Sequence, residues 1–431
     1  MLLVHDLNIE NDVLPTFNFT HTQQGEAALL RLFQQPPGSV QAILERQQTI
    51  QGLRRNWAVV GEFAYSALYQ RETQTFLGNL KSGRTLLISA PIQARLHYFW
   101  SEEYKHRTQA SLIQMVLLLD SLHERYFQHL KPTDFPASFA LQLTAARRFL
   151  DCFNLSQYAE SIRESTFSVS QTLQLTRTLE AISAAEIQAF WDFLFLFEAY
   201  WSVTKAALRR AFCTPAFQET RLGITGLYHP AVVNAVPNTF EQPAHQNVFL
   251  LTGPNMAGKS TLLKALSLCV YLAHLGFDVP ATTCVLPYFD TIAVSINLND
   301  NLRSGYSHFM TELLHLKTVL EQASGSQKCF AVFDELFRGT NPDDALDITR
   351  ATISGLARFS DSVFFVSTHL SPLEPYVVDG AQPAVGSYHI DCELIEGKPV
   401  FSYLLKPGWS QLKIGRILFD EAGLPDLLAQ G

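Results

Sequence analysis

The feature that most constrains this chain is a glycine-rich loop between a predicted strand and a predicted helix. Residues 248–261 read VFLLTGPNMAGKST, and residues 253–260 fit the pattern G-x-x-x-x-G-K-[ST]. The apolar run 248–251 predicts a buried strand, and residues 262–275 predict a helix. In this context, backbone N–H groups and the helix dipole face a phosphate, and glycines leave room for it. The sequence therefore predicts a site for a nucleoside triphosphate.

Two side chains of this loop suit a magnesium nucleotide. Lys259 offers a positive charge to the β- and γ-phosphates, and Ser260 offers a hydroxyl to Mg²⁺. We expect the whole loop to bind the nucleotide, through Gly253, Pro254, Asn255, Met256, Ala257, Gly258, Lys259, Ser260 and Thr261.

A second predicted strand, 329–333, ends in two carboxylates, Asp334 and Glu335. Asp334 can hold Mg²⁺ through water, and Glu335 can polarise the water that attacks the γ-phosphate. Two acids could also do no more than solvate the end of a strand. The phosphate loop upstream favours the catalytic interpretation.

A third predicted strand, 362–367, is followed by Thr368 and His369. Side chains at the carboxyl ends of parallel strands lie at the ligand-binding edge of an open α/β sheet. A lone histidine would carry little meaning, but at this edge His369 can contact the γ-phosphate or the attacking water. We therefore interpret His369 as a sensor of the γ-phosphate.

The chain divides into a helical half and an α/β half. Residues 1–220 have apolar residues at helical spacing and no sustained β-type alternation, which predicts a helical domain. Its predicted helices are 25–33, 39–70, 111–130, 137–153 and 183–212. Residues 221–431 alternate strands and helices, which predicts an α/β domain with a mainly parallel sheet. Its further predicted elements are a strand at 291–297, helices at 311–322 and 343–359, a hairpin at 389–405, and terminal helices at 410–422 and 424–429.

Composition and charge limit the possible partners of the chain. The 431 residues are 47% hydrophobic with a net charge of −8, which indicates a folded protein and weighs against nucleic acid as a partner. The acidity lies mainly in the second half, so a local basic groove in the first half remains open. Three arginine pairs there, 54–55, 147–148 and 209–210, are either solvated faces or contacts to a nucleic-acid backbone.

The six cysteines and the chain's apolar stretches indicate a cytoplasmic protein. The cysteines form no C-x-x-C pair, so they predict reduced thiols rather than a zinc or redox motif. The first residues lack the basic region and long apolar run of a signal peptide. The most apolar window, 190–200, is too short to span a membrane, and we expect a buried or partner-facing helix there.

Four motifs together resemble the ATPase domain of the MutS DNA mismatch-repair family, a branch of the ABC-type P-loop ATPases. They are GPNMAGKST at 253–261, SGYSHFMTEL at 304–313, DELFRGT at 334–340 and THL at 368–370. The tail, 408–425, resembles the AGLP ending of the family core. The first half resembles the family's helical lever domain more weakly. The resemblance is strong over 226–425 and covers nearly the whole chain.

The resemblance implies a set of roles around ATP and Mg²⁺. Asn255 and Lys259 would bind phosphates. Ser260 would hold Mg²⁺ with support from Asp334, and Glu335 would be the general base.

It also implies a composite site in a homodimer. Ser307 would reach the γ-phosphate bound by the partner subunit, so that ATP opens and closes the dimer's helical arms on DNA. His369 would sense the γ-phosphate, and Met256 would lie near the adenine. No clear aromatic residue stands where the family stacks one on adenine, and Val236 and Phe240 are the nearest candidates.

This sequence departs from the family pattern in several places. Phe337 replaces a glycine, His308 a threonine and Asn301 an aspartate. We recognise neither the domain that reads mismatches with a Phe-x-Glu wedge nor the connector domain. The resemblance therefore implies a short, divergent member, and mismatch recognition is not carried over with ATP hydrolysis.

Two functions remain open. The first is an ATP-hydrolysing, DNA-binding protein of DNA repair or recombination. The alternative is a nucleotide-switched protein that acts on a protein partner without mismatch recognition. Its cues are the apolar window 190–200 and the low basicity of the chain.

Overall fold

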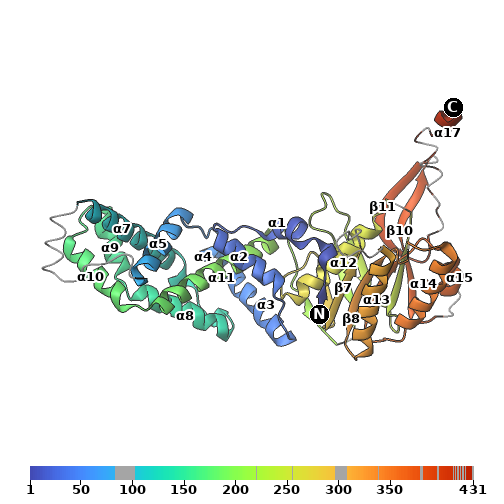
Figure 1. The fold of residues 1–431 in the computed structure, drawn as a ribbon, viewed down its shortest axis with the longest axis horizontal. Coiled ribbons are helices and arrows are strands. Elements are labelled where there is room, and N and C mark those ends of the chain that lie inside the picture. Colours follow the sequence, from blue (N-terminus) through green and yellow to red (C-terminus); the bar gives the residue numbers. More distant parts are fainter. Residues whose placement is uncertain are drawn as a thin grey trace. The chain divides into compact units, whose positions relative to one another are not determined.

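The computed structural model describes most of the chain as two compact units (Figure 1). It describes residues 1–82, 102–219, 221–254, 256–296, 308–337, 339–378, 382–395, 398–410, 412, 414, 417, 419, 422 and 424–429. A helical unit comprises Phe17–Pro36 and Leu44–Ala206, and a second unit with the sheets comprises Met1–Thr16, Pro37–Ile43 and Ala207–Gly431. A helical N-terminal region is thus followed by an α/β region with a mostly parallel sheet, as the sequence predicts.

Ten helices are described in the N-terminal region. They are α1 (Leu14–Phe17), α2 (Gln23–Gln34), α3 (Val40–Arg55), α4 (Trp57–Val60), α5 (Ala67–Lys81), α7 (Glu102–Arg125), α8 (Ala137–Asp151), α9 (Leu155–Arg163), α10 (Val169–Ala181) and α11 (Ala184–Arg209).

The segment predicted as a single helix over 39–70 is divided into α3, α4 and α5, so that prediction is wrong in its length. Carbonyl oxygens in the break bond to distant side chains. The carbonyl oxygen of Val60 accepts a hydrogen bond from Trp201 Nε1 at 2.7 Å, and that of Phe63 lies 2.9 Å from His21 Nε2. Tertiary hydrogen bonds here satisfy backbone groups that a continuous helix would pair internally.

Helix α11 forms the core of the helical unit. The aromatic side chains of the predicted apolar window 190–200 are largely buried in it, which confirms the prediction of a buried helix. The same helix carries a fully buried carboxylate, Glu198, which accepts hydrogen bonds from Thr22 Oγ1 at 3.0 Å and Tyr65 Oη at 2.6 Å. Burial and the adjacent Glu198 raise the pKa of Tyr65, so its phenol keeps the proton for this bond.

Among the described helices, none is long and apolar enough to cross a membrane.

The α/β unit is built around a seven-stranded sheet with the order β1-β7-β8-β9-β5-β10-β11. Neighbouring strands are parallel, except that β10 and β11 form an antiparallel hairpin. The strands are β1 (Leu2–Leu3), β5 (Val248–Thr252), β7 (Thr291–Ser295), β8 (Cys329–Asp334), β9 (Val363–Ser367), β10 (Val385–Ile395) and β11 (Lys398–Pro407). A smaller sheet, in the order β2-β6-β3-β4, comprises β2 (Ala216–Phe217), β3 (Gly223–Leu227), β4 (Asn238–Glu241) and β6 (Thr283–Leu286).

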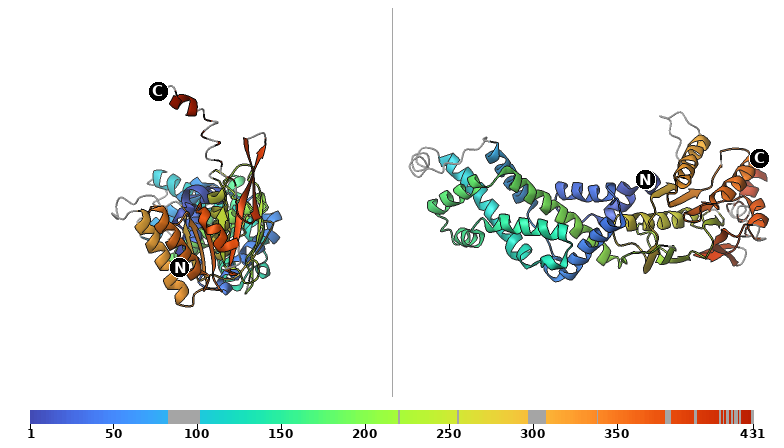
Figure 2. Two further views of the ribbon diagram at one scale, coloured as in Figure 1. Left: turned by 90° about the vertical axis from the view of Figure 1, so that its right-hand side faces the viewer. Right: turned by 90° about the horizontal axis from the view of Figure 1, so that it is seen from below.

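Helices and the smaller sheet cover the two faces of the seven-stranded sheet. Helices α13 (His308–Ser324) and α14 (Pro342–Leu356) lie side by side on one face, where Leu250 and Phe364 are buried (Figure 2). On the other face, the rings of Phe249 and Phe365 lie 5.2 Å apart, and Phe240 of β4 packs 4.9 Å from each. Helix α12 (Lys259–His274) follows β5 and is almost wholly buried. Burial on both faces explains why the central strands are apolar without alternation.

The predicted strands at 248–251, 329–333 and 362–367 and the predicted hairpin are confirmed, with ends that differ by a few residues. The strand β1 was not predicted. It pairs in parallel with β7 and brings the first residues of the chain into the α/β unit, although the sequence analysis assigned 1–220 to the helical domain. The predicted helix 410–422 falls mostly outside the described residues, and 424–429 is helix α17 (Leu424–Ala429).

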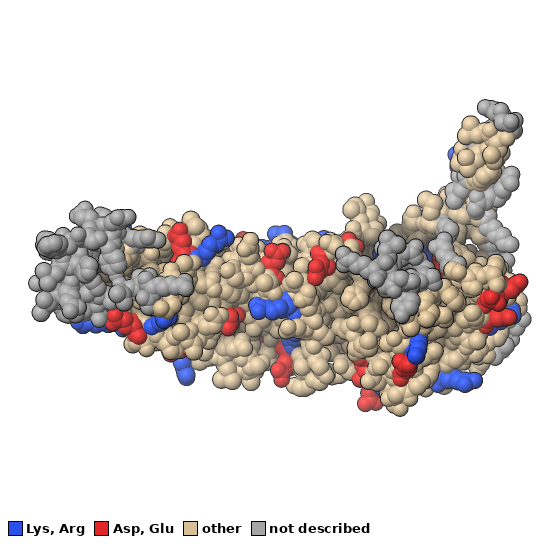
Figure 3. Space-filling view, in the orientation of Figure 1, with Lys and Arg blue, Asp and Glu red and all other residues tan. Residues whose placement is uncertain are grey.

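Charged residues of both signs are interspersed over the face seen in Figure 3, without a large patch of either sign among the residues coloured there. One arginine of the pair 147–148 is partly buried and hydrogen-bonded to the main chain. The Arg147 guanidinium donates to the carbonyl oxygen of Phe127 at 2.8 Å, and burial lowers its pKa. Arg147 is therefore a structural residue rather than part of a solvated face.

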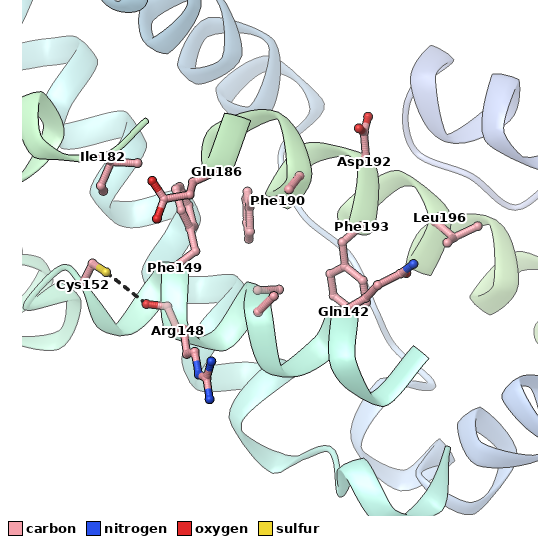
Figure 4. A pocket seen from close by; sticks show the side chains of 13 residues that line it. Gln142, Arg148, Phe149, Cys152, Ile182, Glu186, Phe190, Asp192, Phe193 and Leu196 are labelled. Atoms are coloured by element: carbon pink, nitrogen blue, oxygen red, sulfur yellow. Dashed lines mark hydrogen bonds between the residues drawn. The ribbon is translucent and has the colours of Figure 1, made fainter. Parts of the chain in front are cut away.

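Between α8 and α11 lies a pocket of about 490 Å³ with an aromatic floor (Figure 4). The rings of Phe149 and Phe190 stack there with their centroids 4.7 Å apart. Arg148 also lines the pocket, and its guanidinium group points away from the two phenylalanine rings in Figure 4. The pocket belongs to the packing of these two helices.

A buried histidine at the end of α12 gives the α/β unit a testable pH dependence. His274 lies within hydrogen-bonding distance, 2.8 Å, of the Val270 carbonyl through Nδ1, and its Nε2 accepts from the Phe289 N–H at 2.9 Å. A proton on Nε2 would remove this acceptor, and burial lowers the pKa of His274 to about 4.

We predict that this histidine destabilises the fold as pH falls. In the unfolded chain, the histidine takes up its proton near pH 6.5, whereas in the folded protein it stays neutral until about pH 4. The free energy of unfolding is therefore unaffected by this group above pH 6.5 and decreases as pH falls towards 4. The expected loss is about 3 kcal/mol in the free energy of unfolding, measured by urea titration at pH 7 and pH 4. The variant His274→Gln should show a correspondingly smaller difference between the two pH values. An equal difference in the variant would contradict the prediction.

Candidate functional site

The register of three parallel strands brings the predicted site residues to one edge of the sheet. Leu251 of β5 pairs with Ser367 of β9, and Ser367 pairs with Asp334 of β8. All three strands point the same way, so the segments that follow them leave the sheet side by side. These segments are the glycine-rich loop, Glu335, and the Thr368–His369 pair.

Two positions of the glycine-rich loop have backbone angles that only glycine adopts without strain. Gly253 has φ 139° and Gly258 has φ 95°, both in the region that L-residues disfavour. A Cβ at Gly258 would also lie 3.3 Å from the ring of Tyr403. Met256 has φ 71° and is 76% exposed, and Asn255 lies outside the described residues. Glycine at these two positions therefore allows the chain to turn from β5 into α12.

Lys259, the first residue of α12, is folded back into the loop. Its side chain is only 5% exposed, and Nζ donates to the carbonyl oxygens of Gly253 at 3.0 Å and Pro254 at 3.2 Å. A buried ammonium group needs such acceptors. Ser260 and Thr261 are exposed on the first helical turn, so their hydroxyls are accessible at the same end of α12.

The two carboxylates and the histidine lie together, and a serine that the sequence analysis missed joins them. The Ser367 hydroxyl donates to Asp334 Oδ1 and accepts from the Glu335 N–H at 3.0 Å. Glu335 Oε1 lies 2.6 Å from Nε2 of His369. The side chains of Glu335 and His369 are 21% and 40% exposed, so the pair can contact a ligand. Ser367 ends an apolar strand, and its sequence carries no signal for this role.

A pocket of about 370 Å³ lies beside the loop. Its walls come from the loop, the start of α12, the segment 227–238 and the hairpin. Val236 and Met256 line it, whereas Phe240 is buried in the core between the sheets. Two tyrosines line this pocket, Tyr228 and Tyr403 of β11, and Tyr403 lies far from the loop in sequence and was therefore missed.

Asn238 holds the position of Tyr403. Its Nδ2 donates to the Tyr403 carbonyl oxygen at 3.0 Å, and its Oδ1 accepts from the Leu405 N–H at 2.7 Å. Tyr403 itself has φ 58° and is 45% exposed, so the ring is presented at the pocket with a strained backbone. Nearby His229 is partly buried, and burial followed by the charge of Lys264 lowers its pKa, which favours a neutral ring in the pocket wall.

Ser307 and the metal ion are the remaining predicted features of this site. Ser307 lies outside the described residues, and α13 begins at the following residue, His308. In the described part of the chain, no group of three or more His, Cys, Asp and Glu side chains could hold a metal ion. A magnesium site here would therefore draw on a hydroxyl and one carboxylate, with phosphate and water oxygens as further ligands.

Comparisons with known proteins cover the glycine-rich loop and the three strand ends of this site. Residues 249–430 match the family model described as MutS domain V. A DNA mismatch repair protein MutS from Bacillus cytotoxicus is 35% identical over 193 residues, which cover 45% of this chain and 21% of that protein. The DNA mismatch repair protein MutS from Bacillus thuringiensis has the same identity and coverage. The match thus spans about a fifth of the length of these relatives.

Proposed function

The chain belongs to the MutS family, and we propose that it binds ATP with Mg²⁺ and hydrolyses it at the edge of the seven-stranded sheet. The observation that carries this proposal is that the loop before Lys259, Asp334 with Glu335, and His369 follow neighbouring parallel strands at one edge of the sheet. All four residues lie within the segment that matches MutS domain V. The family model thus covers the residues whose geometry suits phosphoryl transfer.

The loop 253–261 would bind the phosphates. Its backbone N–H groups at the start of α12 favour anions through the helix dipole. The Lys259 ammonium, now on two carbonyl oxygens, would exchange them for phosphate oxygens, which are stronger acceptors because they are charged. The buried position of Lys259 keeps its charge directed into the loop.

Ser260 and Asp334 fit the ligand set of Mg²⁺, which prefers oxygen atoms and keeps several waters. Ser367 orients the Asp334 carboxylate through its hydroxyl. When bound, Mg²⁺ would neutralise charge on the β- and γ-phosphates.

Glu335 would accept a hydrogen bond from the attacking water and polarise it. His369, 2.6 Å from the same carboxylate, would fix its direction and lie close to the γ-phosphate. The pocket lined by Val236, Met256 and Tyr403 would take the base, because an aromatic ring and apolar walls suit a flat heterocycle.

We further propose that the active form is a homodimer acting on DNA. The relatives are named DNA mismatch repair proteins, which supports a role in DNA repair. The alternative, a switch acting on a protein partner, rested partly on the apolar window 190–200. That window is largely buried in the core of the helical unit, so this cue is removed.

Lys259 and Glu335 should affect nucleotide binding and turnover separately. Lys259→Ala should raise the dissociation constant for Mg-ATP by about 10- to 100-fold, because a charged hydrogen bond to phosphate is lost. Glu335→Gln should bind Mg-ATP as tightly as the wild type and lower kcat by about 100-fold or more. Calorimetry and phosphate release measure the two quantities.

Lys317→Ala and Glu321→Gln are matched controls, because this exposed ion pair lies on α13 away from the loop. Both should behave as the wild type. Wild-type turnover in Glu335→Gln would refute Glu335 as the base, and undiminished affinity in Lys259→Ala would refute the loop as the phosphate site.

The composite site is tested by mixing two inactive variants. Ser307→Ala and Lys259→Ala subunits should each be poorly active alone. In a mixed dimer, one site combines an intact Lys259 with an intact Ser307 of the other subunit, so ATP turnover should recover to roughly a quarter of wild type at equal mixing. Absence of any recovery, with mixed dimers verified by mass, would contradict action in trans.

DNA binding is tested with the Glu335→Gln protein on duplex, mismatched, branched and single-stranded DNA, with and without ATP. We expect affinity that falls as salt rises, because Lys and Arg contacts to phosphates release counterions. We also expect ATP to change that affinity. Absence of binding to every DNA at low salt would favour the alternative of a protein partner.

A further inference from the structure

We propose that Glu312, on α13, is a positioning residue that holds the catalytic loop after β8 in the conformation Glu335 needs. The inference rests on the proposed ATPase function of that loop. Glu312 is not among the residues that contact ATP or Mg²⁺ in the scheme above. Its effect would pass through the main chain of residues 335–337.

The loop after β8 has a backbone that its own sequence disfavours. Glu335 has φ 56° and Phe337 has φ 65°, so two non-glycine residues within three positions are left-handed. L-residues avoid this region because the side chain crowds the backbone. Strained backbone conformations persist where surrounding contacts hold them, and they are common at active sites. Phe337 stands where the resembling family has glycine, so this chain needs the enforcing contacts more.

Glu312 supplies the contact at the far end of this loop. Its Oε2 accepts a hydrogen bond from the Phe337 N–H at 2.8 Å. Glu312 is 7% exposed and Phe337 is fully buried, so water competes little for this bond. A carboxylate is a stronger acceptor than a neutral oxygen. The near end of the loop is fixed by Ser367, which accepts from the Glu335 N–H.

Packing against the first turn of α13 reinforces the same attachment. The rings of Phe309 and Phe337 lie 6.1 Å apart in an edge-on arrangement. A Cβ added to Gly339 would lie 3.2 Å from Cβ of Phe309, so the loop passes close to the helix. Glu335 therefore lies between two anchors, Ser367 on β9 and Glu312 on α13.

A purely structural explanation accounts less well for a carboxylate here. Burial of a charged group is unfavourable unless the group is well bonded, and an apolar side chain would fill the same space without that cost. The hydrogen bond of Glu312 goes to a main-chain N–H two residues after the proposed base. Its geometry thus ties the helix to the orientation of Glu335.

The test compares Glu312→Ala with Glu312→Gln in the full chain. Alanine removes the acceptor, whereas the glutamine amide oxygen can accept the same N–H. We expect Glu312→Ala to lower kcat by about 10- to 100-fold, since small displacements of a catalytic group have effects of this size. The dissociation constant for Mg-ATP should change less than about threefold, and Glu312→Gln should recover most of kcat. Glu321→Ala, an exposed residue of the same helix, is the control.

Hydrogen exchange of the peptide containing residues 335–340 gives a readout that does not depend on turnover. The Phe337 amide should exchange faster in Glu312→Ala and be protected again in Glu312→Gln. Unchanged kcat and exchange in Glu312→Ala would overturn the proposal, as would equal impairment of both variants. If Glu312→Ala does not fold, Glu312→Asp, which is shorter by one methylene, takes its place with the same expectations. A wild-type chain without ATPase activity would instead refute the proposed function, while the exchange measurement would still test the anchor.

Discussion

The register of β5, β9 and β8 is the constraint on which the rest of the site depends. It aligns Leu251, Ser367 and Asp334 in one row, so that three segments remote in sequence leave the sheet together. Each strand is buried on both faces, and its apolar side chains lock the register because a shift by one residue would exchange the two faces. The Ser367 hydroxyl then fixes the two acidic residues, because it donates to the Asp334 carboxylate and accepts from the Glu335 N–H.

Charged groups at this edge are held by the protein in positions suited to a ligand. The buried Lys259 ammonium lies on carbonyl oxygens of its own loop, and the Glu335 carboxylate lies against His369. A negatively charged phosphate between them would find a cation on one side and a base on the other. Positive φ angles at Gly258 and Glu335 mark two places where the chain turns to make this room, and only the non-glycine Glu335 is strained by it.

Much of the fold could be predicted because its signals are local. Unbroken apolar runs mark the central strands, and the pattern around Lys259 needs only contiguous residues. What was missed depends on contacts between distant segments. The break in the predicted helix 39–70 is associated with a hydrogen bond from Trp201, and one aromatic side chain of the pocket, Tyr403, is brought there by a hairpin. Ser367 has an ordinary strand sequence, so register alone reveals it.

The most direct test of this account is a crystal structure of the chain with Mg²⁺ and a non-hydrolysable ATP analogue. The account predicts that Lys259 Nζ leaves the carbonyl oxygens of Gly253 and Pro254 and contacts the β- and γ-phosphates. The metal should lie between Ser260 and Asp334, and the base against Tyr403. A nucleotide bound elsewhere, or Lys259 still on the two carbonyl oxygens with the phosphates outside the loop, would contradict the central claim.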